Sequence, residues 1–388
     1  MLAIGSMFAC LHTVVVISLV TGSSTRGTRA LVAGLVGLLL LPVTEVVEGP
    51  RPSDASADLR LVAAAGPTPP TPDLGVQFHG LWSHYDRAKR AAVLNRISGS
   101  GARWVRLDVS WAMIQPRRRS YDLEWGVPRV DRVLKQAERR GLRVLVTFWL
   151  TPGWANGGQG ERVAPDDASD YATALAWAAR RWGDRVGAWE VWNEPNSEDF
   201  LEGADPAGYT DLLCAAHDAL HRQDDTVRVV LGGLMYNDDA WLRRAYASGA
   251  RGCFDILGVH PYMAPADARP ELEDDGEIWR MRHLAAIRRV MTRHDDRRPV
   301  WATEFGWSSH RNAAGAPAWK RGVSQRKQAK YAVRAMTMLG RDYPYVKKAF
   351  WYKALASGDA GRHHDGYAML RRDLSPKPVF RALRRLLR

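Results

Sequence analysis

Residues 143–192 contain one complete strand–helix–strand unit. The β-rich run Arg-Val-Leu-Val-Thr-Phe (143–148) leads to a segment with helical periodicity (168–182), and the run Ala-Trp-Glu-Val-Trp (188–192) follows it. The same alternation continues from Asp73 to the end of the chain. Such alternation is typical of a parallel sheet covered by helices. Strands are predicted at 74–78, 104–109, 143–148, 188–192, 227–231, 256–259, 300–303 and 348–351, and helices near 86–98, 129–140, 168–182, 206–222, 238–248, 277–294, 323–340 and 376–387.

Eight strand–helix units over residues 73–388 predict an α/β fold of the (β/α)8 TIM-barrel type. The alternative is a doubly wound open sheet, whose dinucleotide-binding version needs a Gly-x-Gly-x-x-Gly turn after a strand. No predicted strand is followed by that motif. The pairs Gly157-Gly158 and Gly232-Gly233 are interpreted as turn residues.

The composition is that of a folded protein with a basic surface. The chain has 388 residues, of which 46% are hydrophobic, and a formal net charge of +13. The cationic residues are mostly scattered arginines, and no nucleic-acid-binding motif accompanies them, so we interpret the charge as a solvated surface. We therefore expect no nucleic-acid partner.

The N-terminal region predicts export. Two apolar stretches, 8–20 and 30–43, are shorter than the roughly 20 residues of a spanning helix, and Arg26 and Arg29 precede the second. Residues 1–48 are predicted to be a signal peptide or an uncleaved membrane anchor. Residues 49–72 form a Pro/Ala-rich linker, and residues 73–388 form the folded domain. We expect that domain to be extracellular, secreted or tethered through the N-terminus, and monomeric.

Polar and aromatic residues follow nearly every predicted strand. Because the carboxyl ends of the strands of such a barrel meet at one mouth, where active sites lie, these residues are expected to share a cleft. They are His79, Arg106, Asp108, Trp149, Trp154, Asn193, Glu194, His260, Tyr262, Glu304 and Trp351.

Two of these residues are glutamates in Trp- and Gly/Pro-rich surroundings. Glu194 lies in Trp-Asn-Glu-Pro-Asn (192–196), after the fourth strand, and Glu304 lies in Ala-Thr-Glu-Phe-Gly-Trp (302–307), after the seventh. Cleavage of a glycosidic bond needs one carboxylic acid to protonate the leaving oxygen and a second carboxylate to attack or to activate water. The pair therefore predicts an O-glycosyl hydrolase.

These motifs resemble those of the clan A glycoside hydrolases, which are retaining (β/α)8 enzymes. Within that clan, Trp-Val-Arg-Leu-Asp-Val-Ser-Trp (104–111), Val-His-Pro-Tyr (259–262) and Ala-Phe-Trp-Tyr (349–352) resemble the cellulase-like and β-xylosidase-like families 5 and 39. The resemblance implies hydrolysis of β-linked oligo- or polysaccharides by double displacement. Glu304 would be the nucleophile and Glu194 the acid/base.

The same resemblance assigns supporting roles to other residues. Arg106 is expected to pair with Glu304, Tyr262 to donate a hydrogen bond to the same carboxylate, and Asn193 to hold the sugar 2-hydroxyl. Rigid aromatic rings suit stacking on sugar faces. Trp154, Trp307 and Trp351 are expected to stack on the sugar, His79 and His260 to bind sugar hydroxyls, and Asp108 to contact either substrate or Arg106.

Other functions share parts of this pattern. A transglycosidase would use the same residues, and a non-catalytic polysaccharide-binding barrel would keep the aromatic rim. A phosphate-binding barrel would need a Gly-rich loop where Phe-Gly-Trp-Ser-Ser (305–309) lies. No cofactor is implied, and the spacing of His79 and His260 offers no third ligand for a metal. Cys214 and Cys253 fall in different units and are expected to be two separate buried thiols.

Overall fold

A computed structural model describes residues 71–358 and 361–388. The predicted signal or anchor (1–48) and nearly all of the predicted linker (49–72) lie outside these residues. Within them, no helix is both long and apolar enough to cross a membrane.

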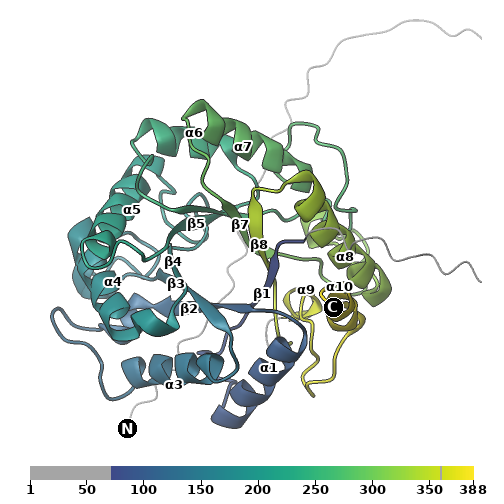
Figure 1. The fold of residues 1–388 in the computed structure, drawn as a ribbon, viewed down its shortest axis with the longest axis horizontal. Coiled ribbons are helices and arrows are strands. Elements are labelled where there is room, and N and C mark those ends of the chain that lie inside the picture. Colours follow the sequence, from purple (N-terminus) through teal and green to yellow (C-terminus); the bar gives the residue numbers. More distant parts are fainter. Residues whose placement is uncertain (1–70, 359–360) are drawn as a thin grey trace, which may run out of the picture. The chain divides into compact units, whose positions relative to one another are not determined.

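The described residues form a closed parallel barrel, which confirms the predicted fold (Figure 1). Each strand pairs in parallel with the next, and β8 closes the sheet by pairing with β1. The strands are β1 (Asp73–Gln77), β2 (Trp104–Ser110), β3 (Arg143–Trp149), β4 (Ala188–Val191), β5 (Val229–Met235), β6 (Ile256–His260), β7 (Val300–Phe305) and β8 (Val346–Trp351).

Helices follow the strands and surround the barrel (Figure 1). Side-chain caps start several of them: the Asp86 carboxylate accepts from Lys89 N, and Asp205 accepts from Ala207 N and Gly208 N ahead of Pro206. The helices are α1 (Arg87–Gly99), α2 (Trp111–Ile114), α3 (Gly126–Glu138), α4 (Ala168–Trp182), α5 (Pro206–His221), α6 (Asp239–Ala247), α7 (Leu284–Arg293), α8 (Gln325–Asp342), α9 (Gly361–Gly366) and α10 (Pro378–Leu386).

The hydrophobic core of the described residues has two main parts, besides a small alanine cluster between α4 and α5 (Ala172, Ala176 and Ala219). The larger part lies between the strands and the helices. The smaller part is a cluster of seven buried residues, which we call the apolar plug; it fills the barrel toward the amino ends of the strands. The apolar plug consists of Trp104, Leu145, Ala188, Val230, Ile256, Trp301 and Phe350.

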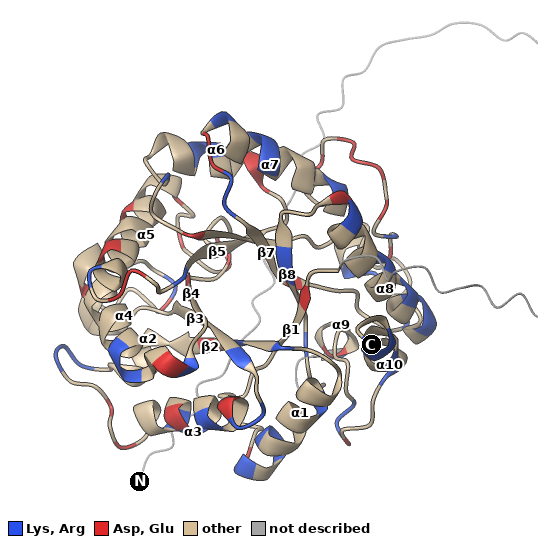
Figure 2. Cartoon of the chain, in the orientation of Figure 1, with Lys and Arg blue, Asp and Glu red and all other residues tan. Residues whose placement is uncertain are grey.

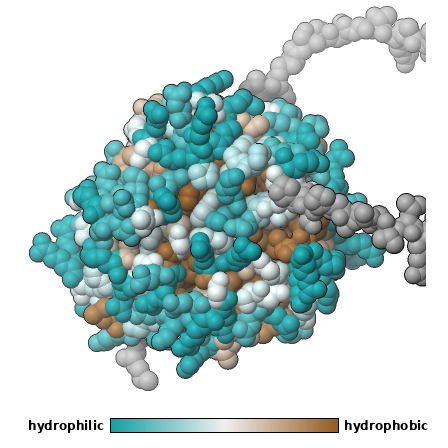
Figure 3. Space-filling view, in the orientation of Figure 1, coloured by the Kyte–Doolittle hydropathy of each residue, from teal (hydrophilic) through white to brown (hydrophobic). Residues whose placement is uncertain are grey.

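The surface carries its positive charge on helices around the whole barrel rather than on one of them (Figure 2). The face drawn in Figure 3 is mostly hydrophilic, with apolar residues near its middle. This distribution agrees with a solvated, Arg-rich surface.

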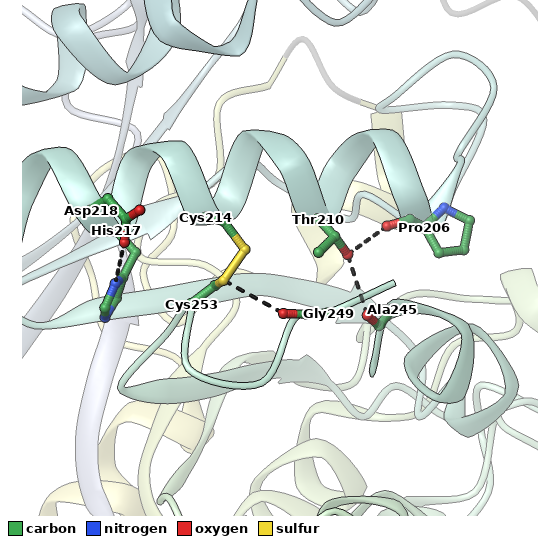
Figure 4. The surroundings of a disulfide bond; sticks show 8 residues. All are labelled: Pro206, Thr210, Cys214, His217, Asp218, Ala245, Gly249 and Cys253. Atoms are coloured by element: carbon green, nitrogen blue, oxygen red, sulfur yellow. Dashed lines mark hydrogen bonds and ion pairs between the residues drawn. A yellow bond between two sulfur atoms is a disulfide. The ribbon is translucent and has the colours of Figure 1, made fainter. Parts of the chain in front are cut away.

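The prediction of two separate thiols is wrong, because Cys214 and Cys253 form a disulfide (Figure 4). Cys214 lies in α5 and Cys253 in the segment between α6 and β6, and their Cα atoms are 4.6 Å apart. Neither residue is fully buried. Units that follow each other in a barrel are lateral neighbours, so a sequence separation of 39 residues does not keep these positions apart.

Candidate active site

The two predicted glutamates meet at the carboxyl ends of the strands. Glu194 follows β4 and Glu304 lies in β7, and their side chains are buried, with 5% and 9% of each residue exposed. One carboxylate oxygen of each and one nitrogen of His260 all lie within 4.8 Å of one another. Residues that are 110 positions apart in the sequence therefore share one small site.

Arg106 holds the site together from β2. Its Nη1 donates to Glu304 Oε1 at 2.6 Å, and its Nη2 donates to Asn193 Oδ1 at 2.7 Å. Its Nε donates to Glu190 Oε2 at 2.6 Å. The guanidinium is fully buried and donates to four acceptors, these three and Gln77 Oε1, whereas a lysine ammonium has only three donors and no planar fork. The predicted Arg106–Glu304 contact is present.

Glu304 has the surroundings of a carboxylate that can ionise near neutral pH. Burial raises the pKa of Glu304 to about 7, while the charge of Arg106 and the hydrogen bond from Tyr262 act in the opposite direction. Tyr262 Oη donates to Glu304 Oε2 at 2.8 Å, as predicted. Both oxygens of Glu304 therefore accept strong hydrogen bonds that favour the charged form.

Glu194 has the surroundings of a carboxylic acid. Burial, and then the nearby negative charge of Glu304, raise the pKa of Glu194 well above its ordinary value. Its Oε1 lies 2.7 Å from His260 Nδ1. Burial, and then the charge of Arg106, hold the pKa of His260 well below its ordinary value, so this imidazole is neutral. The surroundings of Glu304 thus favour the ionised form more than those of Glu194 do, and acid/base chemistry uses such a difference.

The backbone around Glu194 is strained. Trp192 and Glu194 have φ angles of 69° and 44°, a region that residues other than glycine rarely adopt. The buried Trp192 ring donates from Nε1 to Phe200 O, and Glu194 N donates to Gly233 O at 3.2 Å. These contacts hold the strained turn that points the carboxyl group into the site.

Gly233 makes room for His260. Gly232 and Gly233 lie within β5, so their interpretation as turn residues is wrong. Gly157 and Gly158 do lie in a turn, with positive φ angles. A Cβ atom on Gly233 would overlap His260 Nε2 and Thr303 Oγ1. The absence of a side chain there lets His260 Nε2 approach Thr303 Oγ1 to 3.1 Å.

Sequence reasoning missed Glu190. This residue in β4 is fully buried, and its Oε2 accepts from Thr147 Oγ1 at 2.6 Å in addition to Arg106. A charged residue inside the otherwise apolar run Ala-Trp-Glu-Val-Trp is the signal that could have identified it.

Gln77 and Tyr352 were also missed. Gln77 bridges Arg106 and Asp108: its Oε1 accepts from Arg106 Nη1 at 2.9 Å, and its Nε2 donates to Asp108 Oδ2 at 2.7 Å. Tyr352 follows β8 and packs edge-on against Tyr262 and His79. Strand alternation could have predicted Tyr352, because consecutive residues of a strand point to opposite faces.

Two of the predicted sugar-stacking tryptophans are enclosed by protein. Trp307 and Trp351 are 1% and 0% exposed, and their Nε1 atoms donate to Ala268 O and Tyr367 O. This burial leaves little of either ring open to a sugar, so it does not favour the predicted stacking. In contrast, Trp82 is 40% exposed and packs against His79 with 3.9 Å between ring centroids.

The other predicted residues lie at the same end of the barrel. His79 is buried 3.9 Å from Asp108, and burial raises the pKa of Asp108 to about 6 against the opposing charge of Arg106. Arg106 Nη1 is 3.8 Å from Asp108, so Asp108 is a neighbour of Arg106 whether or not it contacts substrate. Trp154 is half-buried, donates to Gln115 O and has the Arg118 guanidinium over its ring.

The spacing of Glu194, His260 and Glu304 would also suit a metal ion. The electrostatics do not, because the Arg106 guanidinium already supplies a positive charge 2.6 Å from Glu304 Oε1. A cation placed between the carboxyl groups would be repelled by Arg106. The arrangement is suited to proton transfer and nucleophilic attack by side chains alone.

Comparisons with known proteins agree with this geometry. The sequence matches the family "Cellulase (glycosyl hydrolase family 5)" over residues 69–340. None of the curated proteins compared matches the chain.

Similar solved structures include several glycosidases. A family 39 glycoside hydrolase from Bacteroides cellulosilyticus has a TM-score of 0.64 at 24% identity, with 81% of this chain and 63% of that chain covered. A β-xylosidase from Caulobacter crescentus has a TM-score of 0.58 at 16% identity (82% and 69% covered). A family 5, subfamily 18 protein from Streptomyces cattleya in complex with GlcNAc has a TM-score of 0.60 at 20% identity (82% and 80% covered).

At these identities the solved structures show the shared barrel fold, and the chain spans less than two thirds of the first of them. The family match covers most of the chain and includes both glutamates. The chain therefore belongs to the cellulase family of clan A, glycosyl hydrolase family 5.

Proposed function

We propose that this protein is a retaining glycosidase that hydrolyses β-linked oligo- or polysaccharides, with Glu304 as nucleophile and Glu194 as acid/base. The observation that carries the proposal is the asymmetry of the buried carboxyl pair. Glu304 accepts from Arg106 and Tyr262, whereas Glu194 faces the neutral His260. The separation of at most 4.8 Å between their nearest oxygens suits the retaining class, whose carboxyl groups lie about 5–5.5 Å apart, better than the wider inverting class.

The first step forms a covalent glycosyl-enzyme. The Glu304 carboxylate attacks the anomeric carbon while the glycosidic C–O bond breaks, and the Glu194 proton moves to the leaving oxygen. Arg106 balances the charge of Glu304 before attack. As that charge is neutralised by bond formation, the nearby Glu190 carboxylate keeps Arg106 in place at 2.6 Å.

The second step returns the enzyme to its starting state. Glu194, now ionised, removes a proton from a water molecule, and the oxygen of that water attacks the anomeric carbon and displaces Glu304. Two inversions give net retention. An acceptor sugar in place of water would give transglycosylation, and product analysis with and without an acceptor distinguishes the two outcomes.

Substrate binding is proposed to use the polar and aromatic residues around the pair. Asn193 Oδ1 accepts a hydrogen bond from Arg106, which fixes the orientation of the amide group. Asn193 Nδ2 makes no hydrogen bond among the described residues, and we propose that it donates to the 2-hydroxyl of the sugar. His79, Asp108 and His260 offer further polar contacts. Trp154 and the exposed Trp82 are the aromatic rings that we propose for sugar stacking. Similar structures include a β-xylosidase and an exo-β-1,4-mannosidase, which makes xylosides and mannosides the first β-glycosides to screen.

The test combines isosteric variants with product stereochemistry. Glu304→Gln and Glu194→Gln should each lower turnover of a natural β-glycoside by at least about 10³-fold, because each removes a group that acts in the transition state. Glu202→Gln is a matched control, since Glu202 is an exposed glutamate in the same β4–α5 segment. Proton NMR of the first product should show the β-anomer; an α-anomer would contradict the retaining mechanism.

Azide separates the two roles. In a Glu194→Ala variant, azide attacks the glycosyl-enzyme without needing a general base, so we expect a β-glycosyl azide from an activated aryl β-glycoside. In a Glu304→Ala variant, azide replaces the nucleophile and should give the α-glycosyl azide. The same azide product from both variants would contradict the assignment.

We also propose that the catalytic domain is exported. The support is the Cys214–Cys253 disulfide, because disulfides persist in oxidising compartments, together with the apolar and Pro-rich N-terminal sequence. The test is N-terminal sequencing of protein from the medium and from the membrane fraction. A full-length product confined to the cytosol would refute export.

A further inference from the structure

Two histidines and an aspartate form a cluster far from the catalytic glutamates. His217 and His221 lie one turn apart near the C-terminal end of α5, and Asp255 lies directly before β6. One potential ligand atom of each lies within 4.8 Å of the other two. Because α5 ends and β6 begins at the amino ends of the strands, the cluster is on the opposite side of the barrel from the active site.

The contacts orient the three side chains toward one point. His221 Nε2 lies 3.2 Å from Asp255 Oδ2, which also accepts from Val229 N at 2.8 Å. The imidazole rings of His217 and His221 are stacked, with 4.0 Å between centroids and 22° between planes. Their side chains and that of Asp255 are 15%, 23% and 19% exposed, so the cluster is largely buried but open to solvent on one side.

His217 has unused ligand capacity. Its buried Nδ1 makes no hydrogen bond among the described residues and lies 3.6 Å from Asp218 Oδ1, too far for a normal one.

The disulfide fixes the two segments that carry the cluster. Cys214 lies on the face of α5 that also carries His217, and Cys253 lies two residues before Asp255 (Figure 4). The bond therefore holds Asp255 against the helix before any ion binds. Such preorganisation is what a site with few protein ligands needs.

We propose that His217, His221 and Asp255 form a zinc site that fastens α5 to the start of β6. Two imidazoles and one carboxylate are a suitable ligand set for Zn²⁺, and a water molecule on the open side would complete four-coordination. Arg228 Nη1 is 4.0 Å from Asp255 Oδ1 but is 56% exposed, so it can turn into solvent when an ion binds. The site is structural and does not depend on the proposed glycosidase activity.

The test is metal titration of the full chain without an affinity tag, after treatment with a chelator. Zn²⁺ in calorimetry should bind with one equivalent, and Co²⁺ should give the visible absorption of a four-coordinate site. A hundredfold excess of Zn²⁺ over its dissociation constant should raise the melting temperature by roughly 3–6 °C. Absence of saturable Zn²⁺ binding would overturn the proposal.

Variants locate the site. His221→Asn and Asp255→Asn should weaken Zn²⁺ binding by more than about 10-fold and abolish the Co²⁺ absorption. Asp255→Asn keeps an oxygen that can accept from Val229 N, so the fold should be preserved. Asp211→Asn, an exposed position in the same helix, is the matched control and should bind as the parent does. Unchanged Zn²⁺ affinity in both ligand variants would overturn the assignment.

The disulfide gives an independent check. A Cys214→Ser, Cys253→Ser double variant that remains folded by circular dichroism should bind Zn²⁺ more weakly while its β-glycosidase turnover is unchanged. If this variant does not fold, the two ligand variants His221→Asn and Asp255→Asn, compared with the control Asp211→Asn, decide the question. Zn²⁺ binding that survives in both ligand variants but depends on Glu194 or Glu304 would place the ion in the active site and overturn the proposal.

Discussion

The two ends of the barrel interior use the same strands for opposite purposes. Toward the amino ends, Trp104, Leu145, Ala188, Trp301 and Phe350 belong to the apolar plug. Two residues further along the chain the side chains are those of Arg106, Thr147, Glu190, Thr303 and, directly after β8, Tyr352. Because residues two apart point to the same side of a strand, a step of about 7 Å changes the interior from apolar to polar and charged side chains, which we call the charged layer.

The difference shows how such a barrel supports both stability and chemistry. In the apolar plug, Trp104 packs edge-on against Trp301, and Lys348 Nζ lies over both rings while pairing with Asp73. This burial stabilises the fold and provides a rigid floor. Burying the charged layer costs desolvation free energy, and this cost is offset only where the charged groups are paired. Variants in the two layers should therefore fail in different ways.

Arg106 variants should show the largest effect, because they break the charged layer at its centre. Arg106→Gln leaves Glu190 and Glu304 buried without their counter-charge, so we expect a loss of about 3–5 kcal/mol in the free energy of unfolding. We also expect a loss of about 10²–10³-fold in kcat/KM. Chemical denaturation and steady-state kinetics measure the two losses.

Arg106→Lys is the matched variant, since it keeps the charge but lacks the planar fork and has three donors for the four acceptors of Arg106. We expect a smaller loss of stability but a similar loss of kcat/KM. Wild-type kinetics in Arg106→Lys would mean that charge alone, and not the planar fork, organises the site.

A variant of the apolar plug should lower stability by a similar amount and leave the chemistry intact. Phe350→Ala removes a fully buried ring and should cost about 3–5 kcal/mol, whereas Phe350→Leu should cost less than about 1.5 kcal/mol. The pH profile of kcat/KM, measured on folded protein well below its melting temperature, should match the parent. A shifted pH profile in Phe350→Ala would contradict the functional separation of the two layers.

The contrast between the layers also explains what the sequence could predict. Strand–helix alternation predicted every strand of the barrel. The search at the carboxyl ends of the strands picked out Glu194, Glu304 and Tyr262, and the strand itself showed Arg106, because strands and their ends are local features. The short helices α2 and α9 were not predicted.

Features that depend on packing between distant segments were not accessible in the same way. Trp307 and Trp351 were predicted to stack on the sugar because they lie near strand ends, but their rings are buried in the core. Glu190 is inside a strand, where a period-2 pattern shows a face but not its partners. The Cys214–Cys253 bond depends on a lateral contact between units that no local pattern reports.

Gly233→Ala tests the tight contact between β5 and the charged layer. The added Cβ would overlap His260 Nε2 and Thr303 Oγ1, so we expect a loss of about 1–3 kcal/mol from overpacking and roughly a 10-fold loss of kcat/KM as His260 moves from Glu194. Gly183→Ala is the control, because a Cβ there meets open space and the φ angle of −46° is allowed. If Gly233→Ala matches Gly183→Ala in both measurements, the placement of His260 does not depend on this contact.

Tyr262→Phe should have the smallest effect and the most specific one. The tyrosine donates to Glu304 Oε2 and thereby favours the ionised carboxylate, whose pKa burial raises to about 7. Loss of this hydrogen bond should raise the pKa of Glu304 further, by about one unit. Because the proposed attack needs ionised Glu304, the acidic limb of the kcat/KM profile should move to higher pH, while the basic limb, which the proposal assigns to Glu194, should stay in place. Tyr367→Phe is the matched control: its ring packs 5.8 Å from that of Tyr262 but donates no hydrogen bond to Glu304, so its acidic limb should coincide with that of the parent. An acidic limb that moves to lower pH in Tyr262→Phe, or equally in both variants, would show that Glu304 is not the group whose ionisation limits turnover.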